Sequence, residues 1–154
     1  MYNSTWVASG PGKGKFGLGA SIKGYRCIVN PLMWATEVRK ARFNLINYDD
    51  IAAKGYTMTD SPQYRLDGIK IPFGNCAEVY PLLKVLKGNT NSAAVHGIAL
   101  RNRGVIPAAY EDNLSGAVWK NVRALCTNCE ELVRMWGGLV ADFDPLADTD
   151  GVPP

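Results

Sequence analysis

Three cysteines and one glutamate form the pattern in this sequence whose chemistry is most specific. Cys76 is followed two residues later by Glu78, and Cys126 and Cys129 form a Cys-x-x-Cys pair fifty residues further along the chain. Zinc binds thiolates well, because it is a borderline-soft ion that prefers tetrahedral coordination. Three cysteine ligands would leave a fourth position for water, which a catalytic zinc site requires and a closed structural site lacks.

Glu78 lies beside these ligands in the sequence without having to be one of them. Zinc lowers the pKa of its water from about 15.7 towards 7. A neighbouring carboxylate can accept the proton of that water and return it later in the reaction. The sequence therefore predicts Glu78 as the catalytic residue of a zinc site with three ligands, Cys76, Cys126 and Cys129.

Two other interpretations of the cysteines remain open. They could form a structural zinc knuckle, or they could be reduced thiols in the core. A knuckle needs a fourth ligand, and neither candidate is convincingly placed. His96 lies in an apolar segment typical of a buried strand, and Cys27 lies far away in the sequence. We expect His96 to pack within that strand and Cys27 to be a small buried hydrophobe.

The two motifs resemble the signature of the zinc-dependent deaminases of the cytidine-deaminase superfamily, which is Cys or His, any residue, Glu, and then Pro-Cys-x-x-Cys. The resemblance covers residues 30–145, and the motifs are its specific part. Leu125 stands where the family usually has Pro, a difference that bears on the subfamily and not on zinc. The resemblance implies a three-layer α/β/α fold, with a mixed sheet of four or five strands and with zinc at the N-termini of two helices.

The resemblance also implies the reaction, which is hydrolytic deamination of cytosine with Glu78 carrying the protons. Cys129 is followed by two glutamates, unlike the Arg-Gln common in small free-nucleoside deaminases, and the chain is more similar to the deaminase domains of bacterial polymorphic toxins. We therefore expect a cytosine deaminase acting on single-stranded nucleic acid, DNA by preference, with an immunity protein as partner if the chain is a toxin domain. The alternatives are a deaminase of a free nucleoside or small heterocycle, and a non-catalytic, zinc-stabilised interaction domain.

Other residues near the motifs are weaker candidates. By resemblance, the backbone N–H of Ala77 would meet the carbonyl group of the base. Asn75 and Asn128 border the ligands and could touch substrate, although capping and local turns explain them equally well. Three thiolates around a dication leave a net negative charge, so we expect help from two helix N-termini and from one arginine among Arg101, Arg103 and Arg123. Several aromatic residues could stack on bases or simply fill the core: Trp34, Trp119, Trp136, Tyr80 and Tyr110.

The composition is that of one ordinary globular domain spanning residues 1–154. Hydrophobic residues make up 47% of the chain and charged residues 20%, which allows a sizeable core. No apolar run has the length of a membrane span, and we expect no secretory leader, because no charged and then apolar segment opens the sequence. Because three of the four cysteines have metal-ligand spacing, we expect a reducing intracellular compartment, the cytoplasm of the cell in which the protein acts. The net charge of +3 is compatible with a polyanionic partner without indicating one, and the oligomeric state stays open.

Turn signals and periodicity predict the elements that position these residues. Residues 1–30 are rich in Gly and Lys and predict loops and short strands. Within them Gly12-x-Gly14-x-x-Gly17 matches a dinucleotide fingerprint by letters, but a suitable helix cannot follow, so we expect a basic loop in which Lys13 and Lys15 could touch a phosphate. Residues 31–46 predict a helix whose apolar face includes Val38, Arg42, Leu45 and Ile46.

A second helix is expected to begin with Asn75 as its N-cap and to stop at Gly88. Its first turn would contain Cys76 and Glu78, and Pro81 would then cause a bend or a loose turn.

Further along the chain, residues 93–100 predict a buried strand, and residues 107–118 predict a connection. Residues 126–136 predict a third helix that ends at Gly137, residues 139–143 a last strand, and residues 144–154 an irregular tail.

Overall fold

The computed structural model describes residues 1–21, 33–46, 74–87, 91–101 and 121–143. Within them the chain forms a sheet of four strands in the order β2-β1-β3-β4, and every neighbouring pair is antiparallel. The strands are β1 (Tyr2–Val7), β2 (Phe16–Ala20), β3 (Val95–Leu100) and β4 (Val122–Arg123). Helices and sheet together confirm an α/β fold. The expected sheet was mixed, whereas the described strands form antiparallel pairs only.

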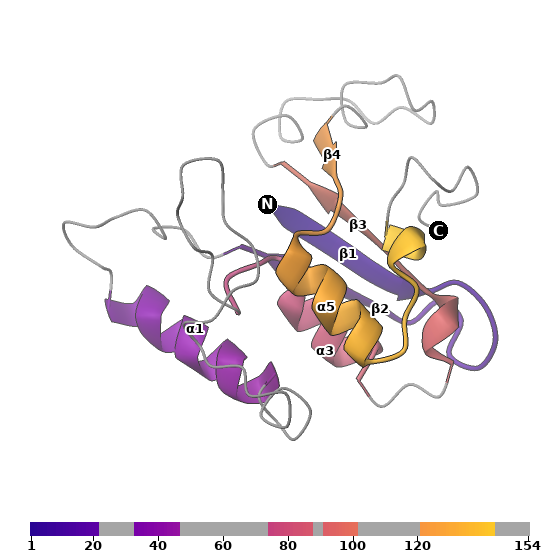
Figure 1. Cartoon of the computed structure of the whole chain (residues 1–154), viewed down its shortest axis with the longest axis horizontal. Helices are drawn as coiled ribbons and strands as arrows, with labels where there is room; N and C mark the ends of the chain where they lie inside the picture. The colour runs from indigo at the N-terminus through magenta and orange to yellow at the C-terminus, as the bar shows by residue number, and fades with distance from the viewer. Residues whose placement is uncertain (22–32, 47–73, 88–90, 102–120, 144–154) are drawn as a thin grey trace.

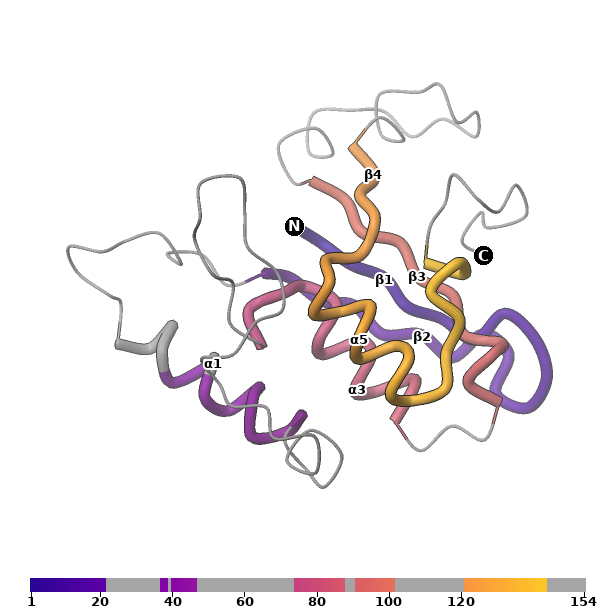
Figure 2. The backbone as a smooth tube through the Cα atoms, viewed as in Figure 1, coloured from indigo at the N-terminus to yellow at the C-terminus, as the bar shows by residue number. Residues whose placement is uncertain are grey.

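Two helices, α3 (Val79–Val85) and α5 (Thr127–Met135), lie side by side on one face of the sheet (Figure 1). A third helix, α1 (Met33–Ile46), packs beside α3. The backbone trace shows β1 and β3 in the middle of the sheet, with β2 and β4 on either side (Figure 2). In the described ranges the helices cover one face of the sheet, so the three-layer arrangement stays a prediction. None of these helices is long and apolar enough to cross a membrane.

Some expectations concern parts of the chain outside the described residues. They are the connection at 107–118, the tail from 144, and the residues Cys27, Gly88, Arg103, Tyr110 and Trp119.

The glycine-rich segment near the N-terminus is the turn that joins β1 to β2. Gly10, Gly12 and Gly14 have φ values of 72°, 91° and 84°, which side chains with a Cβ atom rarely adopt. The strand β2 follows directly, and Gly17 lies inside it, paired with Thr5. The interpretation of this segment as a loop without a nucleotide-binding helix is therefore confirmed.

Glycines in β2 let the start of α3 come close to the sheet. An added Cβ atom at Gly19 would lie 2.6 Å from Pro81 Cδ, and closer still to the carbonyl oxygen of Ala77. One at Gly17 would lie 3.1 Å from Pro81 Cα. The turn that contains Cys76 is therefore held against β2 at a distance that only glycine permits.

Helix α3 begins three residues later than the sequence predicts. Its N-cap residue is Glu78, whose side chain makes no capping hydrogen bond. The prediction of Asn75 as N-cap is therefore wrong, and Cys76 lies in the turn before the helix. Pro81 is then the third helical residue, where the backbone N–H has no partner within the helix. Pro81 therefore fits in the helix, and of the two expected alternatives, a bend or a loose turn, the structure has the turn, which residues 76–78 form ahead of the helix.

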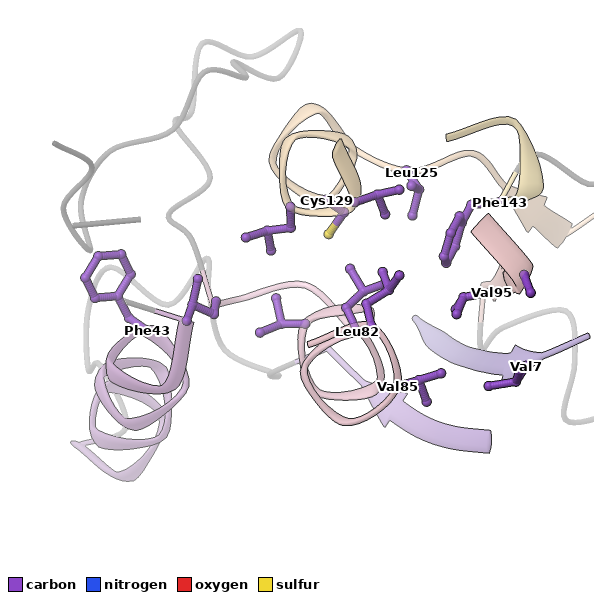
Figure 3. Packing of buried hydrophobic residues seen from close by; sticks show 14 residues of the cluster. Val7, Phe43, Leu82, Val85, Val95, Leu125, Cys129 and Phe143 are labelled. Carbon is purple, nitrogen blue, oxygen red and sulfur yellow. The ribbon is translucent and has the colours of Figure 1, made fainter. Parts of the chain in front are cut away.

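Helix α1 is confirmed, but its buried face differs from the expected one. Phe43 and Ile46 are buried, whereas Val38 and Leu45 are 36% and 51% exposed. The helix packs beside α3 rather than flat on the sheet (Figure 3). Such a contact buries a narrower stripe of side chains than a helix lying on a sheet does.

The last two expected elements have opposite outcomes. Helix α5 is confirmed, and it ends at Trp136 followed by Gly137, whose φ of 76° is typical of a helix terminator. The expected strand at 139–143 is instead a short 3-10 helix, Val140–Phe143. Its Phe143 side chain fills the space left by the missing side chain of Gly97 in β3, and Leu139 remains 52% exposed. One buried anchor, rather than an alternating pattern, holds this segment.

The main core lies between the helices and the covered face of the sheet (Figure 3). Side chains from both helices and from the two central strands meet there, among them Val7, Leu82, Val85, Val95, Leu125 and Phe143. Cys129 belongs to the same cluster and is completely buried. The cysteine motifs are thus anchored in the best-packed part of the molecule.

Candidate metal centre

The sulfur atoms of Cys76, Cys126 and Cys129 lie within 4.8 Å of one another. The sulfurs of Cys76 and Cys126 are 3.2 Å apart. Around a tetrahedral zinc with Zn–S bonds of about 2.3 Å, two sulfurs would be about 3.8 Å apart. The sulfurs of Cys76 and Cys126 are closer than that and no pair is more than 4.8 Å apart, so these three side chains can hold a metal ion after small adjustments. The structure thus brings together the three ligands that the sequence predicts.

The first turn of α5 places two of the sulfurs. Cys126 is the N-cap residue with an extended backbone, and its carbonyl oxygen accepts hydrogen bonds from the N–H groups of Cys129 (2.8 Å) and Glu130 (2.9 Å). Residues three apart at the start of a helix lie on the same side of it. The Cys-x-x-Cys spacing therefore turns both side chains towards α3, and Figure 3 shows the sulfur of Cys129 on that side of α5.

The turn before α3 supplies the third sulfur. Gly74, just ahead of Cys76, is a turn residue with a φ of 85°, a backbone conformation that favours glycine. Ala77 and Glu78 follow and are 1% and 5% exposed. Because this turn is pressed against Gly19, the position of Cys76 depends on strand β2 as well as on α3.

Glu78 is buried next to the sulfurs. Its Oε2 atom lies 3.8 Å from the sulfur of Cys129. Burial, and then the negative charge of Cys126, raise the pKa of Glu78 to about 7. A buried carboxyl group whose pKa is near neutrality, beside a cluster of possible metal ligands, is a candidate proton carrier.

The three thiols differ in how readily they ionise when no metal is bound. Hydrogen bonds from the thiols of Cys129 and Cys76, and then from backbone N–H groups at the start of α5, lower the pKa of Cys126 to about 3. Their hydrogen bonds to Cys126 raise the pKa of Cys76 and of Cys129 well above the usual value. One negative charge is thus concentrated on Cys126, and a bound metal would deprotonate the other two thiols.

An arginine that the sequence analysis missed acts on this site. Arg42 of α1 interacts electrostatically with Cys76, and burial lowers the pKa of its guanidinium group. Its Nη1 atom donates a hydrogen bond to the carbonyl oxygen of Ala20, at 3.2 Å. Arg42 was not among the three expected arginines, because its place depends on how α1 packs. A signal was present, since Arg42 is a cation on the predicted apolar face of its helix.

The weaker candidates have mixed outcomes. The Oδ1 atom of Asn75 is buried and has no hydrogen-bond partner among the described residues, and Asn128 is 1% exposed. Tyr80 is 51% exposed in the first turn of α3. Trp136 lies at the end of α5 opposite to Cys126, so it is removed from the ligands.

His96 lies on the face of the sheet opposite to α3 and α5 and does not join the cysteines. Its ring stacks on that of Trp6, with the ring centres 6.1 Å apart. Alternation along β3 turns Val95 towards the main core and His96 away from it. The expectation that His96 packs within a strand is confirmed, and within the described part of the chain the ligand cluster consists of cysteines alone.

A scan of protein-family models, a search of curated proteins and a search of solved structures each returned no match for this chain.

Proposed function

We propose that the chain is a zinc-dependent hydrolytic deaminase that converts cytosine to uracil in single-stranded nucleic acid, DNA by preference. The observation that carries the proposal is the pairing of three convergent cysteine sulfurs with a buried carboxyl group 3.8 Å from one of them. The sequence resembles the deaminase signature at Cys76, Glu78, Cys126 and Cys129. This resemblance indicates which reaction the three sulfurs and the carboxyl group would catalyse.

Zinc is the metal that the donor set favours. Three thiolates select soft and borderline ions, and zinc alone among the common candidates adds no redox chemistry to a hydrolytic site. When bound, it would supply a polarised water of lowered pKa at the position that the cysteines leave open. The ligands would be Cys76, Cys126 and Cys129.

Glu78 would move the protons of the reaction. It accepts one proton from the attacking water and passes it to ring nitrogen N3 of cytosine, while the water oxygen bonds to carbon C4. It then carries the second proton to the exocyclic amine, whose bond to C4 breaks. The products are uracil and ammonia, so atoms and charges balance. A carboxyl group that exchanges protons near neutral pH suits both transfers.

A purely structural zinc site explains Glu78 less well. A buried carboxylate beside a thiolate is unfavourable, as the raised pKa of Glu78 shows, and a structural site has no use for it. The pairing therefore favours catalysis over an interaction domain that zinc merely stabilises.

The test is a deamination assay with four substrates: a single-stranded DNA oligonucleotide, its duplex, the matching RNA, and free cytidine. We expect uracil in the single-stranded DNA, because a base in a duplex must first be unstacked at a cost of a few kcal/mol. The E78Q variant should retain one zinc per chain and lose about 100- to 10,000-fold in turnover. Elemental analysis measures the zinc in both proteins.

Two results would contradict the proposal. Stoichiometric zinc without turnover of any of the four substrates would favour the structural interpretation. Turnover of free cytidine alone would replace nucleic acid by a small nucleoside as the substrate.

A further inference from the structure

The β1–β2 hairpin presents exposed side chains on the face of the sheet opposite to α3. Phe16 and Leu18 of β2 are 57% and 65% exposed, and Tyr2 of β1 is 42% exposed. They share one face, because Gly17 and Gly19, which alternate with them, point at Pro81 of α3. Such large exposed apolar side chains on one face are typical of a binding surface.

An aromatic row crosses the sheet at the turn end of this hairpin. Phe16 is paired with Trp6, and Trp6 with His96, so the three rings lie on the same face of neighbouring strands. Trp6 is 5% exposed and stacks on His96. Packing therefore holds the inner part of the row in place, while Phe16 at its outer end is open to a ligand.

The charge on this part of the chain is entirely positive. Residues 1–36 contain four Lys or Arg residues and no Asp or Glu, a net charge of +4. The whole chain has 17 basic and 14 acidic residues, so the other residues have 13 and 14, a net charge of −1. Lys13 and Lys15 are exposed in the turn directly before Phe16. The hairpin thus combines aromatic rings with cations and has no acidic residue of its own, which complements a polyanion that carries bases.

We propose that the β1–β2 hairpin binds single-stranded nucleic acid with a surface, here called the hairpin face, that consists of Tyr2, Phe16 and Leu18 on one side of the sheet and Lys13 and Lys15 in the adjoining turn. Bases stack on Phe16 and Tyr2, and phosphates pair with Lys13 and Lys15. Every base has a flat face that can stack, so this binding is tolerant of sequence. Leu18 adds apolar contact between the two rings.

Strand β2 connects the hairpin face to the candidate metal centre, which lies on the other side of the sheet. Strand β2 runs from Phe16 to Ala20 over about 13 Å, at 3.3 Å per residue. Its far end receives the hydrogen bond from Arg42 and touches the turn that contains Cys76. Among the described strands β2 has a neighbour on one side only. A strand of nucleic acid bound on the hairpin face can therefore pass this edge towards the site, and this step rests on the proposed function.

The first test is binding of a dye-labelled oligothymidylate to the zinc-loaded full chain, followed by fluorescence anisotropy. The ligand contains no cytosine, so binding is measured independently of turnover. The F16A variant should bind about 5- to 150-fold more weakly, the loss typical of one stacked base. The F16W variant should retain the affinity, whereas F16L should lose it as F16A does, because leucine is apolar but cannot stack. Phe16 is exposed, and a thermal melt of each variant checks that the fold is unchanged.

The second test concerns the two lysines and has a matched control in the same chain. The K13Q/K15Q variant removes two positive charges from the hairpin face, and K40Q/R134Q removes two from exposed ion pairs on α1 and α5. Each phosphate contact on a single strand contributes about 0.7 to the slope of log affinity against log salt. We expect K13Q/K15Q to lower that slope by about 1.4 and to weaken binding about 25-fold at 0.1 M salt. The control variant should change neither by more than a small amount.

Three outcomes would overturn the inference: no binding of the oligonucleotide by the wild-type protein, wild-type affinity in F16L, or equal losses in the two charge variants. Unchanged affinity of F16L would show that Phe16 does not stack on a base. Equal losses would indicate attraction by net charge alone. Oligonucleotide binding with the expected losses, but without deamination of any substrate, would leave the hairpin face established and refute only the proposed reaction.

Discussion

The close approach of the Cys76 turn to β2 predicts a large effect of one added methyl group. In a G19A variant the new Cβ atom would lie 2.6 Å from Pro81 Cδ and 2.8 Å from Pro81 Cγ. Carbon atoms in contact are normally about 3.5–4.0 Å apart, so the turn would have to move by about 1 Å. No change of rotamer can avoid this, because the obstacles are the ring of Pro81 and the backbone of Ala77.

A shift of this size is larger than a metal site tolerates. Metal–ligand distances in well-formed sites agree within about 0.2 Å, and Ala77 is the direct neighbour of both Cys76 and Glu78. We therefore expect G19A to weaken zinc binding by about 10- to 100-fold, the loss typical of removing a group that supports the ligands. The strain should also lower the free energy of unfolding by about 1–3 kcal/mol.

Zinc affinity is measured by competition with a chromophoric chelator, and stability by urea unfolding. The chain offers a matched control in G17A, where the nearest atom is Pro81 Cα at 3.1 Å. A displacement of a few tenths of an ångström relieves that contact, so G17A should keep most of its zinc affinity. Wild-type zinc affinity in G19A, or equal losses of zinc affinity in G19A and G17A, would refute the dependence of the candidate metal centre on the close approach of β2.

Two further predictions concern the charges at the site. The R42Q variant loses the guanidinium group that interacts electrostatically with Cys76. It should bind zinc about 10-fold more weakly in the chelator assay, and R42K should recover part of the affinity. Equal zinc affinity of wild type, R42Q and R42K would exclude an effect of Arg42 on metal binding. In the metal-free, reduced protein, the pKa of Glu78 is about 7, above its ordinary value of 4.5, so the folded state favours the protonated carboxyl group. The stability that Glu78 contributes is thus complete below about pH 4.5 and is lost as the pH rises to about 7, a change of about 3 kcal/mol. Relative to wild type, E78Q should therefore be more stable at pH 8 than at pH 4.5 by this amount in urea unfolding, and a difference independent of pH would contradict the burial of an ionisable Glu78.

The ligand set could be predicted from the sequence because its geometry is mostly local. Cys126 and Cys129 are brought together by one turn of helix, a consequence of their spacing alone. The Cys76-x-Glu78 segment is also short, and its pairing with the second motif came from the resemblance to a known signature. The predicted start of α3 was wrong by three residues, but this did not affect the predicted site, because Cys76 and Glu78 lie in the same short turn.

The parts that could not be predicted depend on tertiary packing. Arg42 interacts electrostatically with Cys76 because α1 packs beside α3, and the cation on the predicted apolar face of its helix does not by itself say which group it will face. The segment 139–143 has the composition of a strand, but the anchoring of Phe143 over Gly97 decides its form. Gly19 is unremarkable in the sequence, since its role appears only when the Ala77 carbonyl is seen against it.

The packing of the candidate metal centre into the core bears on the role that a metal would have there. Small zinc-stabilised modules depend on their metal because they lack a sufficient hydrophobic core. Here the core joins all three helices to the central strands and consists mainly of aliphatic side chains, with Cys129 as its buried ligand. In the metal-free protein the same site is unfavourable, because it buries a carboxyl group and a thiol of raised pKa, those of Glu78 and Cys76, beside Cys126, whose pKa is lowered. A metal site set into such a core is therefore expected to serve the proposed reaction rather than to hold the fold together.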